Sequence, residues 1–274
     1  MSAGPPVTIL DGAMGSLLEQ RGFALPAPGW SAHVVRDHPQ AIQQIHAEYA
    51  RAGATVHTAC TFRTRRRNAG DDWKHLTEAA VQAARAGVPG GHRVAGSVAP
   101  LESCYRPDLS PKDSRAEHRD LALALASCPV DILLCESFPN VAEALVAVEE
   151  CVATGLETWV GFCAGPQANL LSAEEMRRGA IAAAARGASA VFVNCTAAAG
   201  VTPYVHALRD AGVRVGAYAN AGDVREGIGW GSGTSGARRY ALLARDWVNA
   251  GASLIGGCCG TDPSHTAELQ ALCI

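Results

Sequence analysis

Short apolar runs rich in β-branched residues recur eight times in this chain of 274 residues, and helical Ala/Leu/Arg stretches separate them. Strands are expected at about residues 7–11, 55–62, 93–98, 131–136, 158–163, 190–195, 214–219 and 253–258. Helices are expected at about residues 39–52, 76–86, 116–126, 141–153, 173–186, 203–211 and 235–250. Regular alternation of strand and helix is typical of a parallel α/β sheet.

Glycines at the junctions support this pattern, because Gly53, Gly187 and Gly251 each stand where a helix should end and a strand begin. The composition does not change along residues 1–274, which predicts one domain. The (β/α)₈ TIM barrel fits eight repeats in this length best. A doubly wound open sheet is the alternative, but no GxGxxG follows the first strand.

The overall composition argues against several classes of protein. A net charge of -3 gives no reason to expect a nucleic-acid partner. No apolar stretch approaches the roughly 20 residues that span a bilayer, and residues 1–6 lack the features of a signal peptide. Most of the ten cysteines lie in apolar runs, as expected of a reduced cytosolic protein rather than a disulfide framework.

Polar and reactive side chains follow the expected strands at their C-terminal ends, where the active sites of barrel enzymes lie. They are Asp11, Thr61, Glu136, Asn194, Cys195, Asn220, Cys258 and Cys259.

Three of these residues are cysteines at the ends of two strands. Cys258 and Cys259 lie in the sequence GGCCGT, and Cys195 ends an earlier apolar run. Three thiolates with one open position are typical of a catalytic zinc site, in which a substrate thiol could be the fourth ligand. The alternatives are buried cysteines or a redox-active vicinal pair, although a disulfide between adjacent residues requires strained geometry.

Together these motifs resemble the homocysteine S-methyltransferases. This family includes betaine–homocysteine and S-methylmethionine–homocysteine methyltransferases and the homocysteine-binding module of cobalamin-dependent methionine synthase. The matching segments are DGAMG at 11–15, TF at 61–62, ESFPN at 136–140, VNCT at 193–196, YANAG at 218–222 and GGCCGT at 256–261. The resemblance extends over nearly the whole chain.

The resemblance implies a zinc barrel that methylates the sulfur of homocysteine to give methionine. It implies that Cys195, Cys258 and Cys259 bind zinc, and that Asp11 and Glu136 bind the substrate ammonium. It also implies that the backbone amides of a nest bind the carboxylate, and that two asparagines support the site. The nest is Gly12, Ala13 and Met14, and the asparagines are Asn194 and Asn220.

Two departures argue against betaine as the methyl donor. Arg63 stands where the betaine enzymes carry a tyrosine, and Ser137 stands where they carry an aromatic residue. The expected donor is therefore a small onium compound, with S-methylmethionine or S-adenosylmethionine favoured.

Aromatic faces suit a cationic donor. Trp30, Phe62, Tyr218 and Trp230 are the candidates, and ordinary packing under a loop is the alternative for each. Arg63, Arg65, Arg66 and Arg67 form a basic run that is either a solvated loop face or, at Arg63, an anchor for a substrate carboxylate. The glycine-rich segment 227–233 is expected to be a flexible lid.

The sequence therefore predicts a cytoplasmic zinc-dependent S-methyltransferase with two small-molecule substrates, homocysteine and an onium donor. Neither a nucleic acid nor a membrane is expected as a partner, and a homo-oligomer is possible. One alternative keeps the zinc barrel but takes the methyl group from a separate corrinoid protein or another onium metabolite. Another is a non-catalytic zinc- or thiol-binding subunit. Donor identity stays open because the loops that build donor pockets vary freely on this scaffold.

Overall fold

The computed structural model describes residues 6–221, 227–229, 231 and 233–273. Its strands are β1 (Thr8–Ile9), β2 (Val56–Ala59), β3 (Arg93–Val98), β4 (Ile132–Phe138), β5 (Glu157–Phe162), β6 (Ala190–Ala197), β7 (Arg214–Asn220) and β8 (Leu254–Gly257). They form one parallel sheet in the order β1-β8-β7-β6-β5-β4-β3-β2.

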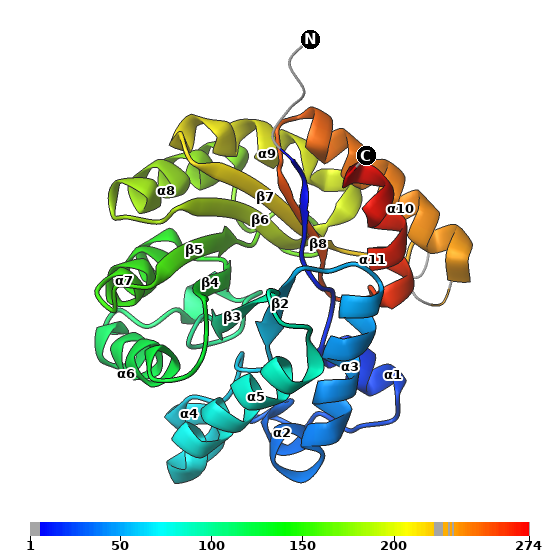
Figure 1. Ribbon diagram of the computed structural model, residues 1–274. Helices are drawn as coiled ribbons and strands as arrows, with labels where there is room; N and C mark the ends of the chain where they lie inside the picture. Colours follow the sequence, from blue (N-terminus) through cyan, green and yellow to red (C-terminus); the bar gives the residue numbers. More distant parts are fainter. Residues whose placement is uncertain (1–5, 222–226, 230, 232, 274) are drawn as a thin grey trace.

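Helices surround this sheet (Figure 1). They are α1 (Gly15–Gln20), α2 (Ala32–Asp37), α3 (Pro39–Arg51), α4 (Arg66–Ala69), α5 (Trp73–Gly87), α6 (Arg115–Ala126), α7 (Val141–Val152), α8 (Ala173–Ala185), α9 (Thr202–Leu208), α10 (Gly233–Asn249) and α11 (Pro263–Leu269).

The first and last strands of this order meet, which closes the sheet. A parallel bridge joins Leu10 to Val56. On either side of it, the Thr55 N–H donates to the Ile9 carbonyl at 2.9 Å and the Asp11 N–H donates to the Val56 carbonyl at 3.0 Å. The expected (β/α)₈ barrel is confirmed, and the doubly wound alternative is excluded.

The junction glycines act as the sequence predicts. Gly53, Gly187 and Gly251 have φ angles of 106°, 104° and 117°, a left-handed conformation that ends each preceding helix before the next strand begins. The first turn of α7 is likewise fixed by Asn140, whose side chain accepts the Glu143 N–H at 3.1 Å.

Large side chains fill the inside of the barrel. Trp159 on β5, Phe192 on β6 and Tyr218 on β7 form a continuous aromatic stack, with ring centroids 5.5 Å and 5.4 Å apart. All three belong to the interior apolar cluster and are buried. This stack, which we call the aromatic floor, lies beneath the residues at the C-terminal ends of the strands.

The expected strands 7–11 and 55–62 are longer than the observed β1 and β2. The chain leaves the sheet pattern early at β2, because the Thr61 N–H turns back to the Ala59 carbonyl at 2.6 Å. Four helices of four to seven residues, α1, α2, α4 and α11, lie outside the expected set. Trp230 and Gly222 lie outside the described residues.

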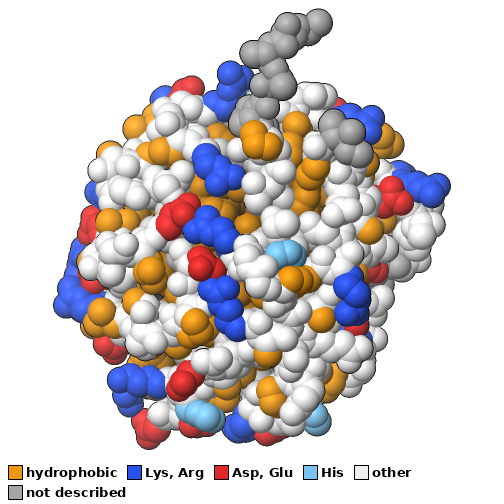
Figure 2. Space-filling model, viewed as in Figure 1, with side chains coloured by type: hydrophobic (Ala, Val, Ile, Leu, Met, Phe, Trp, Pro, Cys, Tyr) orange, Lys and Arg blue, Asp and Glu red, His pale blue; other side chains and the backbone are white. Residues whose placement is uncertain are grey.

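Basic and acidic side chains are interspersed over the face shown in Figure 2, and a line of alternating charges crosses its middle. Ion pairs also lie near the N-terminal ends of the strands: Arg93 of β3 pairs with Glu157 of β5 at 2.7 Å, and Arg85 of α5 pairs with Asp131, just before β4, at 2.6 Å. Within the described residues, no helix is both long enough and apolar enough to cross a membrane.

Candidate active site

A pocket of about 550 Å³ opens at the C-terminal ends of the strands. Its lining includes most of the site residues expected from the sequence, from β1 through β8. Those residues are Asp11, Gly12, Ala13, Met14, Trp30, Phe62, Arg63, Glu136, Cys195, Cys258 and Cys259. The two expected asparagines contact this pocket's residues from behind.

Backbone conformation marks the same pocket. Among the described residues, four that are not glycine have a positive φ, and three of them line the pocket. These are Trp30 at 48°, Ser137 at 65° and Cys195 at 46°. Such conformations cost about 1–3 kcal/mol each and gather at functional sites, where the surrounding structure holds them.

Glu136 on β4 is fixed in the pocket by one neighbouring strand, β3, and by β7, which does not adjoin β4 in the sheet. Its carboxylate accepts hydrogen bonds from the Ser97 hydroxyl on β3 and, at 3.3 Å, from the Tyr218 hydroxyl on β7. Burial raises the pKa of the Glu136 carboxyl, and the two hydroxyls partly oppose that rise. A cationic group in the pocket would therefore favour its ionised form.

The three expected zinc ligands meet in this pocket. The sulfurs of Cys195 and Cys258 are bonded to each other, with their Cα atoms 5.7 Å apart. The third cysteine, Cys259, has a free thiol whose pKa is raised by burial, and the nearby Tyr105 side chain partly opposes that rise. All three line the pocket, and reduction of the Cys195–Cys258 bond would give it three thiols, a soft donor set.

Asn194 orders the groups around Cys195. Its side-chain oxygen accepts the Ser137 N–H at 3.1 Å, and its amide donates to the Ser137 hydroxyl at 2.8 Å. That hydroxyl lies 3.1 Å from the Cys195 sulfur. Ser137, which the sequence marked only as a departure from the betaine enzymes, is thus a polar contact of a candidate ligand.

The loop after β1 is bound tightly to the loop after β8. The Ala13 N–H donates to the Thr261 hydroxyl at 3.2 Å, and the Tyr49 hydroxyl donates to the Ala13 carbonyl at 2.8 Å. A Cβ on Gly12 would lie 2.8 Å from both hydroxyl oxygens, so only glycine fits there. Because the Ala13 amide has a partner in the protein, a carboxylate in this expected nest would compete with Thr261 for it.

The loop after β3 contributes two pocket residues that the sequence analysis did not select, Cys104 and Tyr105. The Tyr105 hydroxyl accepts a hydrogen bond from the Asn220 amide at 3.4 Å, in addition to its contact with Cys259. Burial raises the pKa of Cys104 to about 12, so this thiol stays protonated. Their position in the loop that follows the strand expected at 93–98 was the available signal.

Aromatic side chains form one wall of the pocket. Trp30 packs edge-on against Phe62 at 5.8 Å, and its ring occupies the space that a Cβ on Gly15 would need. Arg63 lies over the Phe62 ring at 5.0 Å. Tyr218 lies near the end of β7, within the strand expected at 214–219, and its hydroxyl donates to Glu136.

The basic run divides between core and surface. The Arg63 guanidinium donates to three carbonyls of the loop after β3, those of residues 100–102, at 3.0–3.5 Å. Arg65 is buried and donates to the Phe62 carbonyl at 3.0 Å. Arg66 and Arg67 form ion pairs at the surface with acidic side chains. The run is therefore only partly a solvated face.

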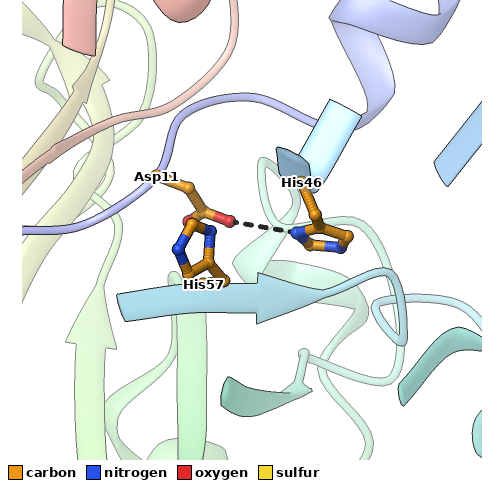
Figure 3. Close-up of side chains that lie close together, drawn as sticks. All are labelled: Asp11, His46 and His57. Atoms are coloured by element: carbon orange, nitrogen blue, oxygen red, sulfur yellow. Dashed lines mark ion pairs between the residues drawn. The ribbon is translucent and has the colours of Figure 1, made fainter. Parts of the chain in front are cut away.

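Behind the pocket, Asp11 lies beside two buried histidines, His46 on α3 and His57 on β2 (Figure 3). One oxygen or nitrogen of each of the three lies within 4.8 Å of the others, so the cluster could hold a metal ion. The Asp11 carboxylate also accepts the Thr58 N–H at 2.8 Å. Burial raises the pKa of Asp11 and lowers that of His46 to about 3, so this imidazole is neutral at neutral pH.

Comparison with known proteins identifies the barrel. The family model described as homocysteine S-methyltransferase matches residues 8–273. The chain belongs to the homocysteine S-methyltransferase family. The predicted resemblance is thereby confirmed, as is the prediction that the chain is a member of a methyltransferase family.

Members of the homocysteine S-methyltransferase family align along almost the entire chain. The homocysteine S-methyltransferase of Escherichia coli is 31% identical over 297 residues, covering 97% of this chain and 94% of the relative. The S-methylmethionine–homocysteine S-methyltransferase BHMT2 of Mus musculus is 30% identical over 270 residues, covering 90% and 73%. The crystal structure of the E. coli homocysteine methyltransferase MmuM, metallated form, matches with a TM-score of 0.79 at 29% identity, covering 98% and 96%.

Two observations suggest a metal in this member of the homocysteine S-methyltransferase family. One is the metallated form of a structural relative, and the other is the possible metal-binding cluster of Asp11, His46 and His57. Neither identifies the metal or its ligands.

Proposed function

We propose that this protein is a zinc-dependent methyltransferase that moves a methyl group from a small onium donor to the thiol of homocysteine, giving methionine. The observation that carries the proposal is the convergence of three cysteines and two buried carboxylates, Asp11 and Glu136, in one pocket. An acceptor with an ammonium at one end and a thiol at the other matches these two groups.

The sulfur set fits zinc. Three pocket-lining cysteines leave one position of a tetrahedral site open, which is the composition of a catalytic rather than a structural site. Cys195, Cys258 and Cys259 would be the ligands, supported by the Ser137 hydroxyl 3.1 Å from Cys195 and by the Tyr105 side chain at Cys259. When bound, zinc would hold the substrate sulfur as a thiolate at neutral pH.

The remaining residues would hold the acceptor and donor in place. Glu136, fixed by Ser97 and Tyr218, would bind the ammonium through charge-assisted hydrogen bonds and so set the position of the sulfur. In the transfer, the sulfur forms a bond to the methyl carbon while the bond from that carbon to the onium atom breaks. The electron pair stays with the neutral leaving group.

The aromatic wall supports a cationic donor. Trp30 and Phe62 present ring faces and edges to the pocket, which suits the methyl groups of a sulfonium. Arg63 lies at the same wall and would offer its charge to a donor carboxylate, which S-methylmethionine and S-adenosylmethionine both carry. S-methylmethionine is the donor named in one relative at 30% identity.

The proposal is tested with reduced protein and a matched pair of serine variants. We expect one zinc per chain and turnover of homocysteine with a sulfonium donor. Cys258→Ser should lose both, while Cys128→Ser should keep both, because Cys128 follows α6, donates to the Ala124 carbonyl and does not line the pocket. Absence of zinc from the reduced wild type, or full activity in Cys258→Ser, would overturn the proposal. Turnover only with a methylated corrinoid protein would replace the onium donor by the alternative.

A further inference from the structure

The proposed reaction releases a proton. A thiol R–SH and a sulfonium CH₃–S⁺R₂ give the thioether R–S–CH₃, the sulfide SR₂ and H⁺, so the S–H proton must leave the site. The donor and acceptor share one pocket, and both fill it during turnover. The two substrates would then block the pocket mouth, and a second route would let the proton leave while they are bound. This argument depends on the proposed function.

A row of titratable side chains leads away from the pocket. Asp11 lines the pocket, and its carboxylate oxygen lies 3.8 Å from Nδ1 of His46. His57 lies within 4.8 Å of both (Figure 3). Its Nε2 is hydrogen-bonded to Nδ1 of His92 at 3.1 Å, and the two rings stack with centroids 5.4 Å apart.

The row ends at the opposite end of the barrel. Val56 points into the barrel interior, so His57, the next residue on β2, faces the surrounding helices. His92 directly precedes β3 and is partly exposed at the N-terminal ends of the strands. The row therefore passes between the sheet and α3, from the pocket to the far surface.

Packing alone does not explain these histidines. Both ring nitrogens of His46 are buried without a hydrogen-bond partner among the described residues. Each such nitrogen costs about 1–3 kcal/mol, and a leucine would avoid that cost. Burial lowers the pKa of His57 to about 4, with His92 contributing, so both inner rings are neutral near neutral pH. A neutral imidazole donates at one nitrogen and accepts at the other.

We propose that Asp11, His46, His57 and His92 form a proton path from the substrate pocket to the opposite end of the barrel. The proton lost by the thiol or by Asp11 when the ammonium binds would pass to the imidazoles and leave at His92. The two wider steps, at 3.8 Å and within 4.8 Å, are distances that one bridging water or a ring rotation spans.

Other charged and polar groups face the residues of the row but are not part of it. Glu136 and the Tyr49 hydroxyl face Asp11, and the Arg85 guanidinium donates to the His92 carbonyl at 3.2 Å. The Ala54 carbonyl faces His57. A divalent cation bound by Asp11, His46 and His57 is the competing use of the cluster, and it would block the path.

The test measures proton release in weak buffer after zinc-loaded enzyme, saturated with an unreactive analogue of the sulfonium donor, is mixed with homocysteine, using a pH indicator in a stopped-flow instrument. We expect His92→Ala to slow release by roughly ten-fold or more, with the same final number of protons and the same Kd for homocysteine. Added imidazole should restore the rate, which it could not do if His92 were only structural. His75→Ala, which removes an exposed histidine of α5, should behave as wild type.

A second variant, His57→Gln, interrupts the row and should be slow without rescue by imidazole. Wild-type release rates in both His92→Ala and His57→Gln would overturn the proposal, as would loss of a metal ion from His57→Gln with the cysteines intact. Failure of the proposed function would look different, because wild-type enzyme would then release no proton on mixing with homocysteine.

Discussion

Lowering the pH from about 7.5 to about 5 should destabilise this protein through two buried histidines. The folded-state pKa values of His46 and His57, about 3 and about 4, lie below the ordinary value of 6.5. The unfolded chain therefore takes up protons that the folded chain does not. The stabilisation is complete above about pH 6.5 and is lost as the pH falls from there toward the folded-state values.

The size of this effect follows from the shifts. A pH of about 5 lies about 1.5 units below the pKa of a histidine in the unfolded chain, and each unit corresponds to about 1.4 kcal/mol. Each histidine should thus cost about 2 kcal/mol of stability. The raised pKa values of Asp11 and Glu136 act in the opposite sense, because their contribution is lost as the pH rises through them.

Comparison with His46→Leu separates these contributions, because the carboxyls are common to both proteins. Urea unfolding at the two pH values should show that wild type loses about 2 kcal/mol more than the variant. Near pH 7.5 the variant should be at least as stable as wild type, since it removes two buried nitrogens without partners. Equal losses in the two proteins would refute the argument that His46 is held neutral.

Three further substitutions test the pocket. Glu136→Gln should raise the Kd for homocysteine roughly 10- to 100-fold through loss of a charged hydrogen bond; calorimetry showing an unchanged Kd would remove Glu136 from substrate binding. Gly257→Ala places a Cβ 2.3 Å from the Thr261 hydroxyl and should cost about 1–3 kcal/mol in denaturation, whereas Gly90→Ala, in open space, should be nearly neutral. Tyr105→Phe should speed zinc loss to a chelator by roughly ten-fold, and an unchanged rate would show that its hydroxyl does not support Cys259.

The parts of the fold that could be predicted from the sequence are those governed by local rules. Glycine at 53, 187 and 251 marks the left-handed end of a helix just before an apolar run, and these apolar β-branched runs identify the strands. Parallel strands then bring their C-terminal ends together, which places Asp11, Glu136 and the cysteines in one pocket.

Other features depend on tertiary contacts that no local pattern encodes. His46 occupies an ordinary core-facing position of α3, and only the folded chain places it beside His57. Tyr105 reaches Cys259 through an irregular loop whose path follows from Arg63 binding its carbonyls. The left-handed conformation of Ser137 is likewise imposed by Asn194 from another strand.

The strands that carry the pocket residues also fix the distance between the groups proposed to bind the ammonium and those proposed to bind the sulfur. Glu136 stands on β4, Cys195 on β6 and Cys258 directly after β8, and each of these strands is hydrogen-bonded to its neighbours in the sheet. Glu136 and Cys195 both lie where a shift of register interrupts the pairing of their strand, so the backbone itself fixes where each side chain enters the pocket. The separation between the groups proposed to bind the ammonium and the sulfur is therefore set by the scaffold and not by mobile loops. We expect the barrel to act as a molecular ruler that rejects cysteine, one methylene shorter than homocysteine, while the loops above are free to change the donor.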